Sequence, residues 1–176
     1  MTRSKPKKNK PYLPISGDSP FSPEAFCNIM RHLAGAVCVV STNGPTGKHG
    51  LAATAVCSVC AEPPTLLAVV NRTSRTHPHI RKNETFSVNI LSEQQADVAK
   101  LMSSRSDNQF AELPHKLADG GGVLIDDTLG QLHCRVVAEH DVGTHTIFIG
   151  RILDGNIGAG SPLIYYKANF RTLRAT

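Results

Sequence analysis

Short runs of apolar residues, several of which alternate with polar residues, recur along this 176-residue chain. Residues 86–91, Phe-Ser-Val-Asn-Ile-Leu, alternate in the way that a half-buried strand does. Turn-forming sequences such as Asn43-Gly-Pro-Thr-Gly47 and Glu62-Pro-Pro64 separate the runs. This pattern predicts a series of strands, which we place at residues 36–42, 51–60, 65–70, 86–91, 132–139, 144–153 and 163–166.

Apolar residues at helical spacing occur in two places. Ser22-Pro23-Glu24 supplies an N-cap residue, a first-turn proline and an early acid, so we predict a helix from there to about Leu33. A second helix is predicted over residues 92–102, where a serine and an acid precede the apolar positions. Residues 103–122 are polar and end in three consecutive glycines, so we expect a mobile loop or a short helix there.

Strands outnumber helices in this prediction, and most links between the strands are short. The expected fold is mainly β, a small antiparallel β-barrel with two or three flanking helices. One such domain fits residues 21–176. Residues 1–20 contain four prolines, and the first ten contain five basic residues and no acid, so we predict a disordered basic tail there.

The net charge of +5 belongs to that tail, because the chain without its first ten residues has 14 basic and 14 acidic residues. A body without excess positive charge is not expected to bind nucleic acid. Apolar stretches such as 33–40 and 66–70 are much shorter than the roughly 18 residues of a membrane-spanning helix. We therefore expect a soluble, cytoplasmic protein that does not bind a membrane.

The cysteines favour free thiols over a disulfide framework. Their number is odd, and we find no export signal, which points to a reducing compartment. Two of them have C-x-x-C spacing, but residues three apart on a strand point to opposite faces. We therefore predict no metal site at that pair. The five cysteines are Cys27, Cys38, Cys57, Cys60 and Cys134.

Residues 71–76, Asn-Arg-Thr-Ser-Arg-Thr, carry groups that suit a phosphate. The segment follows a predicted strand and precedes a short helical segment, and it offers two guanidinium groups, three hydroxyls and the N–H groups of a helix start. The same residues also suit an ordinary capped turn. His145 begins a strand directly after a turn, a position typical of a site residue and also of a hydrogen-bonded edge histidine.

Six segments, in this order, resemble the flavin reductase-like family, whose members are small FMN-binding split barrels. Members serve as reductase components of two-component monooxygenases. Together the segments cover most of the predicted domain. They are residues 32–42 (HLAGAVCVVST), 50–64 (GLAATAVCSVCAEPP), 70–74 (VNRTS), 86–91 (FSVNIL), 143–150 (GTHTIFIG) and 162–166 (PLIYY).

The resemblance implies which positions bind the cofactors. His145 aligns with a histidine near the nicotinamide and flavin rings and is the implied catalytic residue, and Tyr166 aligns with an aromatic residue beside the nicotinamide. Four positions depart from the family pattern. Many members have Thr at Ala52, an acid at Thr144 and Ser at Cys60, and a phenylalanine common near the flavin loop is replaced by Met102. The implied flavin-binding residues are Gly50, Leu51, Ala52, Thr54, Ala55, Val56, Cys57, Ser58, Asn71, Ser74, Arg75, Ser103 and Ser104.

The function that the resemblance implies is an NAD(P)H-dependent flavin reductase. It would transfer hydride from NADH or NADPH to FMN or FAD, act as a homodimer, and supply reduced flavin to a partner monooxygenase. A single phosphate-binding cluster favours FMN over FAD. Two alternatives remain open at this point: a bound-FMN reductase for another acceptor, such as a cobalt corrinoid, a ferric complex or a quinone, and a non-catalytic flavin-binding electron carrier.

Overall fold

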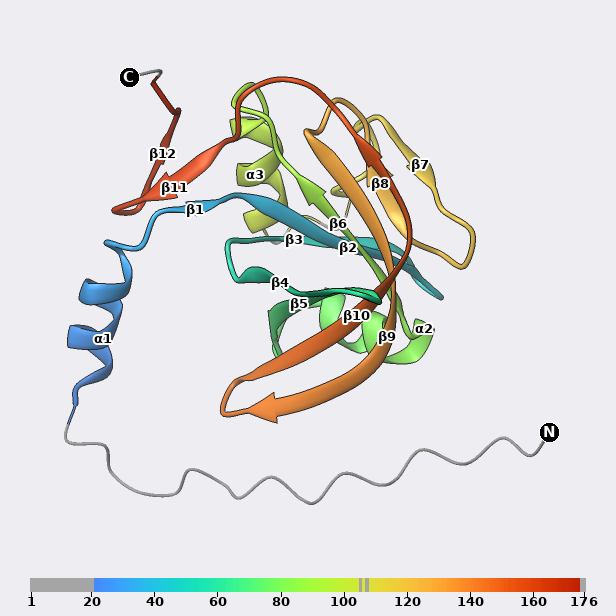
Figure 1. Ribbon diagram of the computed structural model, residues 1–176, viewed down its shortest axis with the longest axis horizontal. Helices are drawn as coiled ribbons and strands as arrows, with labels where there is room; N and C mark the ends of the chain where they lie inside the picture. The colour runs from blue at the N-terminus through green and yellow to red at the C-terminus, as the bar shows by residue number, and fades with distance from the viewer. Residues whose placement is uncertain (1–20, 105, 107, 175–176) are drawn as a thin grey trace.

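The computed structural model describes residues 21–104, 106 and 108–174, so the predicted tail at residues 1–20 lies outside the described residues. The main feature is a seven-stranded antiparallel sheet in the order β3-β2-β6-β9-β10-β5-β4 (Figure 1). Its strands are β2 (Cys38–Gly44), β3 (Gly47–Ala53), β4 (Val56–Ala61), β5 (Pro64–Asn71), β6 (Thr85–Ile90), β9 (Gly130–Val142) and β10 (His145–Ile157).

A two-residue link turns this sheet into a split barrel. The edge strands β3 and β4 are consecutive in the chain and are joined only by Thr54 and Ala55. The sheet therefore curls until its two edges approach, although no ladder joins β3 to β4 within the described residues. This confirms the prediction of a small antiparallel barrel, and the curl brings parts of the chain that are distant in sequence to one side.

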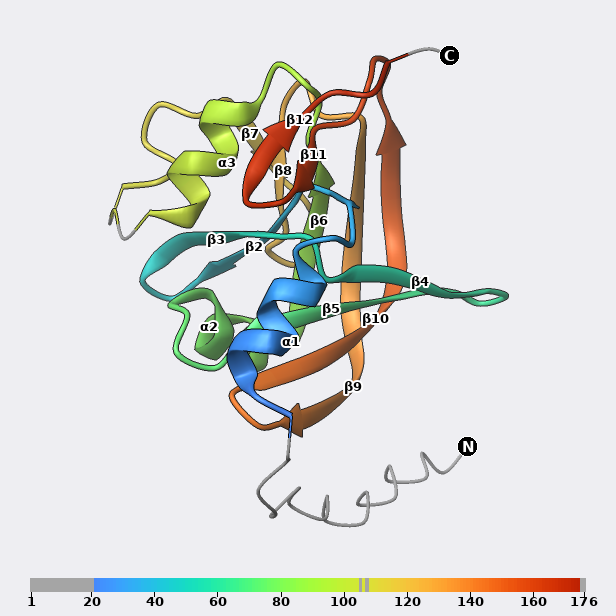
Figure 2. The same ribbon diagram turned by 90° about the vertical axis from the view of Figure 1, so that its left-hand side faces the viewer.

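Smaller elements flank the barrel (Figures 1 and 2). Strand β3 lies between α2 and α3 (Figure 2), whereas α1 lies beside the barrel with three large apolar side chains exposed. The helices are α1 (Pro23–Met30), α2 (Thr76–Asn83) and α3 (Ala96–Ser103). The short strands are β1 (Gly35–Ala36), β11 (Ile164–Tyr166) and β12 (Asn169–Arg171) in one sheet, and β7 (His115–Leu117) and β8 (Val123–Ile125) in a hairpin.

Strand β2 is buried on both faces over its first five residues, which explains why the consecutive residues Cys38, Val39 and Val40 are all apolar. Val40 packs inside the barrel with Phe86 and Phe148, whereas its neighbour Val39 packs in a second cluster beneath α3 and β8. Successive residues of a strand point to opposite faces, so one strand serves both clusters. A β-carbon on Gly150 would lie 2.6 Å from Cζ of Phe86, so a larger residue there would displace the barrel core.

A buried asparagine joins β6 to β2 and β8. The Asn89 amide nitrogen donates to the carbonyl oxygens of Val39 (3.2 Å) and Val123 (3.1 Å), and its Oδ1 accepts from Ile125 N (2.8 Å). Because Asn89 is fully buried, losing these bonds would leave unpaired backbone groups. The bonds hold the β7–β8 hairpin against the barrel.

Several predicted element boundaries differ from the structure. The predicted strand 51–60 is two strands, with the break at Thr54 and Ala55. The second predicted helix corresponds to α3, which begins at Ala96 and not at residue 92. Ser92 N instead donates to Oε1 of Gln95 in a turn that precedes the helix. Residues 103–122 contain β7, and the strand β12 was not predicted. The first helix begins as predicted, with the Ser22 hydroxyl accepting from Ala25 N.

A stacked pair of histidines connects β3 to α2. The rings of His49 and His79 lie parallel with centroids 4.0 Å apart, and both Nε2 atoms lie within hydrogen-bonding distance of the Thr46 hydroxyl, at 3.0 and 3.2 Å. One hydroxyl proton can serve only one acceptor, so one neutral imidazole accepts from Thr46 and the other donates to it.

None of the helices in the described part of the chain is long and apolar enough to cross a membrane.

We predict that this pair makes the fold sensitive to acid. Burial lowers the pKa of His49, with further lowering by the charges of His79 and Arg75, and burial and Lys82 lower the pKa of His79. Below the ordinary histidine pKa of about 6.5, the unfolded chain takes up protons that the folded chain resists, so the free energy of unfolding falls as pH falls.

Urea denaturation between pH 8 and pH 5.5 measures this dependence. The double substitution His49→Gln/His79→Gln is expected to flatten it, although His77 and His133 have lowered pKa values too and leave a residual slope of the same sign. His140→Gln, at an exposed position on β9, is the matched control. An unchanged slope in the double variant would contradict the prediction.

Candidate functional site

Three segments that are distant in sequence enclose a pocket of about 800 Å³, a volume within the range of roughly 300–1,000 Å³ that is typical of small-molecule sites. We call it the phosphate-loop pocket. One wall is β3, another is the loop between β5 and α2, and the third is the end of α3 with the segment that follows it. The lining residues are Gly50, Leu51, Ala52, Thr73, Ser74, Arg75, Thr76, Met102, Ser103, Ser104 and Gln109.

The loop between β5 and α2, which we call the phosphate loop after its predicted ligand, is shaped by its own side chains. Oδ1 of Asn71 accepts from both N and Oγ1 of Thr73, each at 2.8 Å. Oγ of Ser74 accepts from His77 N at 3.2 Å. Asn71 is therefore used within the loop and does not line the pocket, whereas Ser74 does. The loop leads into α2 at Thr76, and the first N–H groups of a helix lack intrahelical partners.

The structure distinguishes the two arginines of this loop. Arg75 lines the pocket, and its Nη2 donates to the carbonyl oxygen of Ser106, in the segment after α3. Arg72 is directed elsewhere, since its Nη1 lies 3.4 Å from the carbonyl oxygen of Gly143 at the tip of the β9–β10 hairpin. One guanidinium group thus remains beside the pocket, where it suits an anion.

Gly50 keeps the opposite wall close to the end of α3. A β-carbon there would lie 2.8 Å from Sδ of Met102 and 3.0 Å from Cζ of Phe110, so the backbone can approach these side chains only without one. Gly50 N lies 3.4 Å from Oε1 of Gln109. This wall offers mostly backbone and small side chains, which suits a flat ligand.

The two predicted serines at the end of α3, Ser103 and the C-cap residue Ser104, also line the pocket. The hydroxyl of Ser103 donates to the carbonyl oxygen of Ala99 (2.8 Å), and that of Ser104 donates to the carbonyl oxygen of Leu101 (2.7 Å). Because both hydroxyl protons are donated to backbone carbonyl oxygens of α3, the two serines can only accept hydrogen bonds from a ligand. Four lining residues were not predicted as flavin contacts: Thr73, Thr76, Met102 and Gln109. Of these, only the two threonines lie within residues 71–76, the segment predicted to suit a phosphate.

The predicted residues of the β3–β4 link and of β4 lie elsewhere. Thr54, Val56, Cys57 and Ser58 line a separate apolar depression of about 840 Å³, together with residues that include Met30 and Leu33. The carbonyl oxygen of Ala55 accepts from Val69 N. One chain therefore does not bring the predicted flavin-binding residues into a single pocket.

The two predicted nicotinamide residues are also far apart in one chain. His145 begins β10 opposite Asn71 of β5, and its Nδ1 lies 2.9 Å from Oγ1 of Thr144. Tyr166 is on β11, where its ring contacts His32 edge-on with centroids 6.3 Å apart. Figures 1 and 2 place β11 and the tip of the β9–β10 hairpin at opposite ends of the molecule. His145 alone lies beside the loop that forms the pocket.

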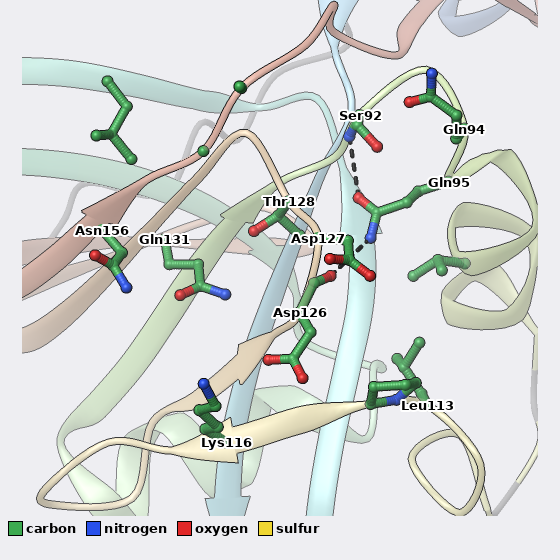
Figure 3. A pocket seen from close by; sticks show the side chains of 15 residues that line it. Ser92, Gln94, Gln95, Leu113, Lys116, Asp126, Asp127, Thr128, Gln131 and Asn156 are labelled. Atoms are coloured by element: carbon green, nitrogen blue, oxygen red, sulfur yellow. Dashed lines mark hydrogen bonds between the residues drawn. The ribbon is translucent and has the colours of Figure 1, made fainter.

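A larger depression, of about 1,000 Å³, contains none of the predicted residues (Figure 3). Its lining includes the carboxylates of Asp126 and Asp127 and a single cationic side chain, Lys116. Figure 3 shows Gln95 joining Ser92 N to the carbonyl oxygen of Asp126. Two carboxylates disfavour an anion there, so for a phosphorylated ligand the phosphate-loop pocket is the better site despite its smaller volume.

The phosphate-loop pocket therefore suits a ligand with a phosphate group and a flat body. Hydroxyls of the loop, the Arg75 guanidinium and the start of α2 face one region, and the backbone of Gly50–Ala52 forms the facing wall. This donor set fits a flavin mononucleotide. No group of three His, Cys, Asp or Glu side chains that could hold a metal occurs among residues 21–104, 106 and 108–174.

Comparison with known proteins agrees with this geometry. The family model for the flavin reductase like domain matches residues 30–174. The FMN reductase (NADH) RutF of Methylorubrum extorquens is 36% identical over 157 residues, which cover 88% of this chain and 78% of that protein. A reductase component of a 4-nitrophenol 4-monooxygenase/4-nitrocatechol 2-monooxygenase from Rhodococcus opacus is 34% identical over 151 residues, covering 86% of this chain and 81% of that protein.

A solved structure shows the same fold. The NADH:FAD oxidoreductase of Streptomyces globisporus C-1027, in complex with NAD and FAD fragments, superposes with a TM-score of 0.81 at 25% identity. The match covers 86% of this chain and 92% of that one. With the family model matching most of its length, the chain belongs to the flavin reductase-like domain family.

Proposed function

We propose that this protein is an NAD(P)H-dependent flavin reductase that reduces FMN and releases it to a partner monooxygenase. The observation that carries the proposal is the phosphate-loop pocket, in which Ser74 and Arg75 face the glycine-containing wall of β3. Relatives named as an FMN reductase (NADH) and as a monooxygenase reductase component support it. FAD remains a second flavin substrate, because the related Streptomyces enzyme is named for it.

The chain's own residues position the reactants. Bound flavin supplies the ring that accepts hydride from the nicotinamide. Arg75, Ser74 and the start of α2 hold the phosphate, and the Gly50–Ala52 backbone contacts the flat ring system. His145, at the tip of the β9–β10 hairpin, orients the nicotinamide. Hydride transfer needs the two rings stacked at reacting distance and no acid–base pair, so positioning is the protein's main contribution.

A second copy of the chain completes the site in this proposal. His145 and Tyr166 lie at opposite ends of one chain, and the β3–β4 link lines an apolar depression separate from the phosphate-loop pocket. The neighbouring helix α1 exposes apolar side chains, among them Phe26 and Ile29, and Leu33 just beyond the helix is 69% exposed. A homodimer that covers this face would supply the missing residues from the partner. The five free thiols suit the reducing cytoplasm as its location.

The first test is the visible spectrum of the purified protein, followed by the rate of NADH and NADPH oxidation with and without added FMN or FAD. We expect a weakly coloured protein whose NADH oxidation rises with added FMN. A yellow protein that oxidises NADH only with a different acceptor would support a bound-flavin reductase. A yellow protein that does not oxidise either nicotinamide would support an electron carrier, and both outcomes would contradict the proposal.

Arg75→Ala is predicted to weaken FMN binding selectively. Loss of one charge-assisted contact to the phosphate should raise the FMN Kd about tenfold, whereas riboflavin, which lacks the phosphate, should bind as it does to the unaltered protein. Quenching of flavin fluorescence measures both constants. Arg72→Ala is the matched control, since Arg72 does not line the pocket. Equal weakening of FMN and riboflavin binding would refute a phosphate contact.

His145→Ala is predicted to affect the nicotinamide and not the flavin. The apparent KM for NADH should rise, or kcat should fall, for a loss of about tenfold in kcat/KM, while the FMN Kd stays unchanged. Steady-state kinetics at saturating FMN separate the two effects. Unchanged kinetics in this variant would remove His145 from the site.

A further inference from the structure

A chain of hydrogen bonds, buried at its His77–Thr146 end, connects α2 to the β9–β10 hairpin. Nε2 of His77 lies 2.8 Å from Oγ1 of Thr146, and Oγ1 of Thr146 donates to Oδ1 of Asp141 at 2.5 Å. The same Oδ1 accepts from Nη2 of Arg81 at 2.7 Å. Thr146 is fully buried and His77 is 6% exposed, so water does not compete for their bond.

The direction of each bond follows from the chemistry of the groups. A carboxylate only accepts, so the single hydroxyl proton of Thr146 goes to Asp141. Thr146 must then accept from His77, which fixes the neutral imidazole with its proton on Nε2. Burial and the Arg81 guanidinium lower the pKa of His77, against smaller opposing effects of Asp141 and Glu139, and this favours the neutral ring. The His77 ring also packs against Phe148, with centroids 5.5 Å apart.

The chain connects two parts of the site. His77 is the second residue of α2, and its backbone N–H donates to Oγ of Ser74, in the loop that lines the pocket. Thr146 follows His145 directly, and successive strand residues point to opposite faces. Because the hydrogen bond to His77 holds the Thr146 side chain on one face of β10, the His145 side chain is held on the opposite face.

We propose that His77, acting through Thr146, is a positioning residue that holds His145 in register with the phosphate loop. This inference rests on the proposed function, since it assigns a role in bringing the nicotinamide side of the site to the flavin side. The backbone ladder already pairs His145 with Asn71. The side-chain bond adds a second attachment from α2, so that the hairpin tip and the loop move together.

Thr146→Val tests the attachment, because valine keeps the shape and removes the hydroxyl. We expect kcat for NADH oxidation to fall and the apparent KM for NADH to rise, for a loss of about tenfold in kcat/KM, with the FMN Kd unchanged. Thr146→Ser restores the hydroxyl and should restore the kinetics. Thr85→Val is the matched control, since the buried Thr85 hydroxyl donates to Gly120 and takes no part in this chain.

Two further measurements do not depend on Thr146→Val remaining folded. His77→Gln can place an amide N–H near the former Nε2 and should retain activity, whereas the shorter His77→Asn should lose it. Nitrogen-15 NMR of the histidines in the unaltered, flavin-free protein should show His77 with its proton on Nε2. A proton on Nδ1 would refute the bond pattern.

The outcomes separate this inference from the proposed function. An unaltered protein that does not oxidise NADH or NADPH with added flavin would refute the function itself. An active protein whose Thr146→Val variant has unchanged kinetics would refute the inference alone. An equal loss in Thr146→Val and Thr85→Val would also refute it, because it would show a general effect of losing a buried hydroxyl.

Discussion

The antiparallel pairing of β5 with β10 is the interaction on which the site depends. It places His145 opposite Asn71, where β5 ends and the phosphate loop begins. A shift of one residue in this register would turn every side chain of β10 to the other face of the sheet. Phe148 would then leave the core and Thr146 would leave His77, so the hydrophobic core and the site geometry specify the same register.

The two-residue link between β3 and β4 determines the shape of the sheet and the position of the pocket. It forces the sheet to curl, which places β3 between α2 and α3 and creates the phosphate-loop pocket on one side. The same link carries Thr54 away from that pocket, into the lining of the apolar depression beside α1. One local turn thus divides a continuous sequence segment between two surfaces, and the proposed homodimer would give both surfaces a role.

The sequence was sufficient for the fold class and most strands, because apolar alternation and turn residues are local signals. It also singled out the loop between β5 and α2, which lines the pocket, since hydroxyls and guanidinium groups at a strand–helix junction have a recognisable chemistry. The residue types alone did not distinguish Arg75 from Arg72, although the family resemblance named Arg75, and neither signal showed that Gln109 lines the pocket. Those assignments depend on where α3 ends in space. The start of α3 was also missed, because the Gln95 side chain and not Ser92 satisfies the backbone there.

Buried polar groups in this fold occur where elements join, whereas apolar groups fill the core. This division of roles explains how a small barrel can hold the candidate site in a precise geometry. Apolar packing of Phe86, Phe148 and Val88 supplies cohesion but tolerates small displacements, because dispersion contacts have no preferred direction. Hydrogen bonds between buried groups are directional, and an unpaired buried group is costly, so Asn89 and Thr146 each permit a narrow range of arrangements. Asn89 fixes the β7–β8 hairpin, whereas Thr146 fixes the hairpin that carries His145. The core keeps the barrel folded, and in the proposed function the polar joints would set the distances that a reaction between two bound rings requires.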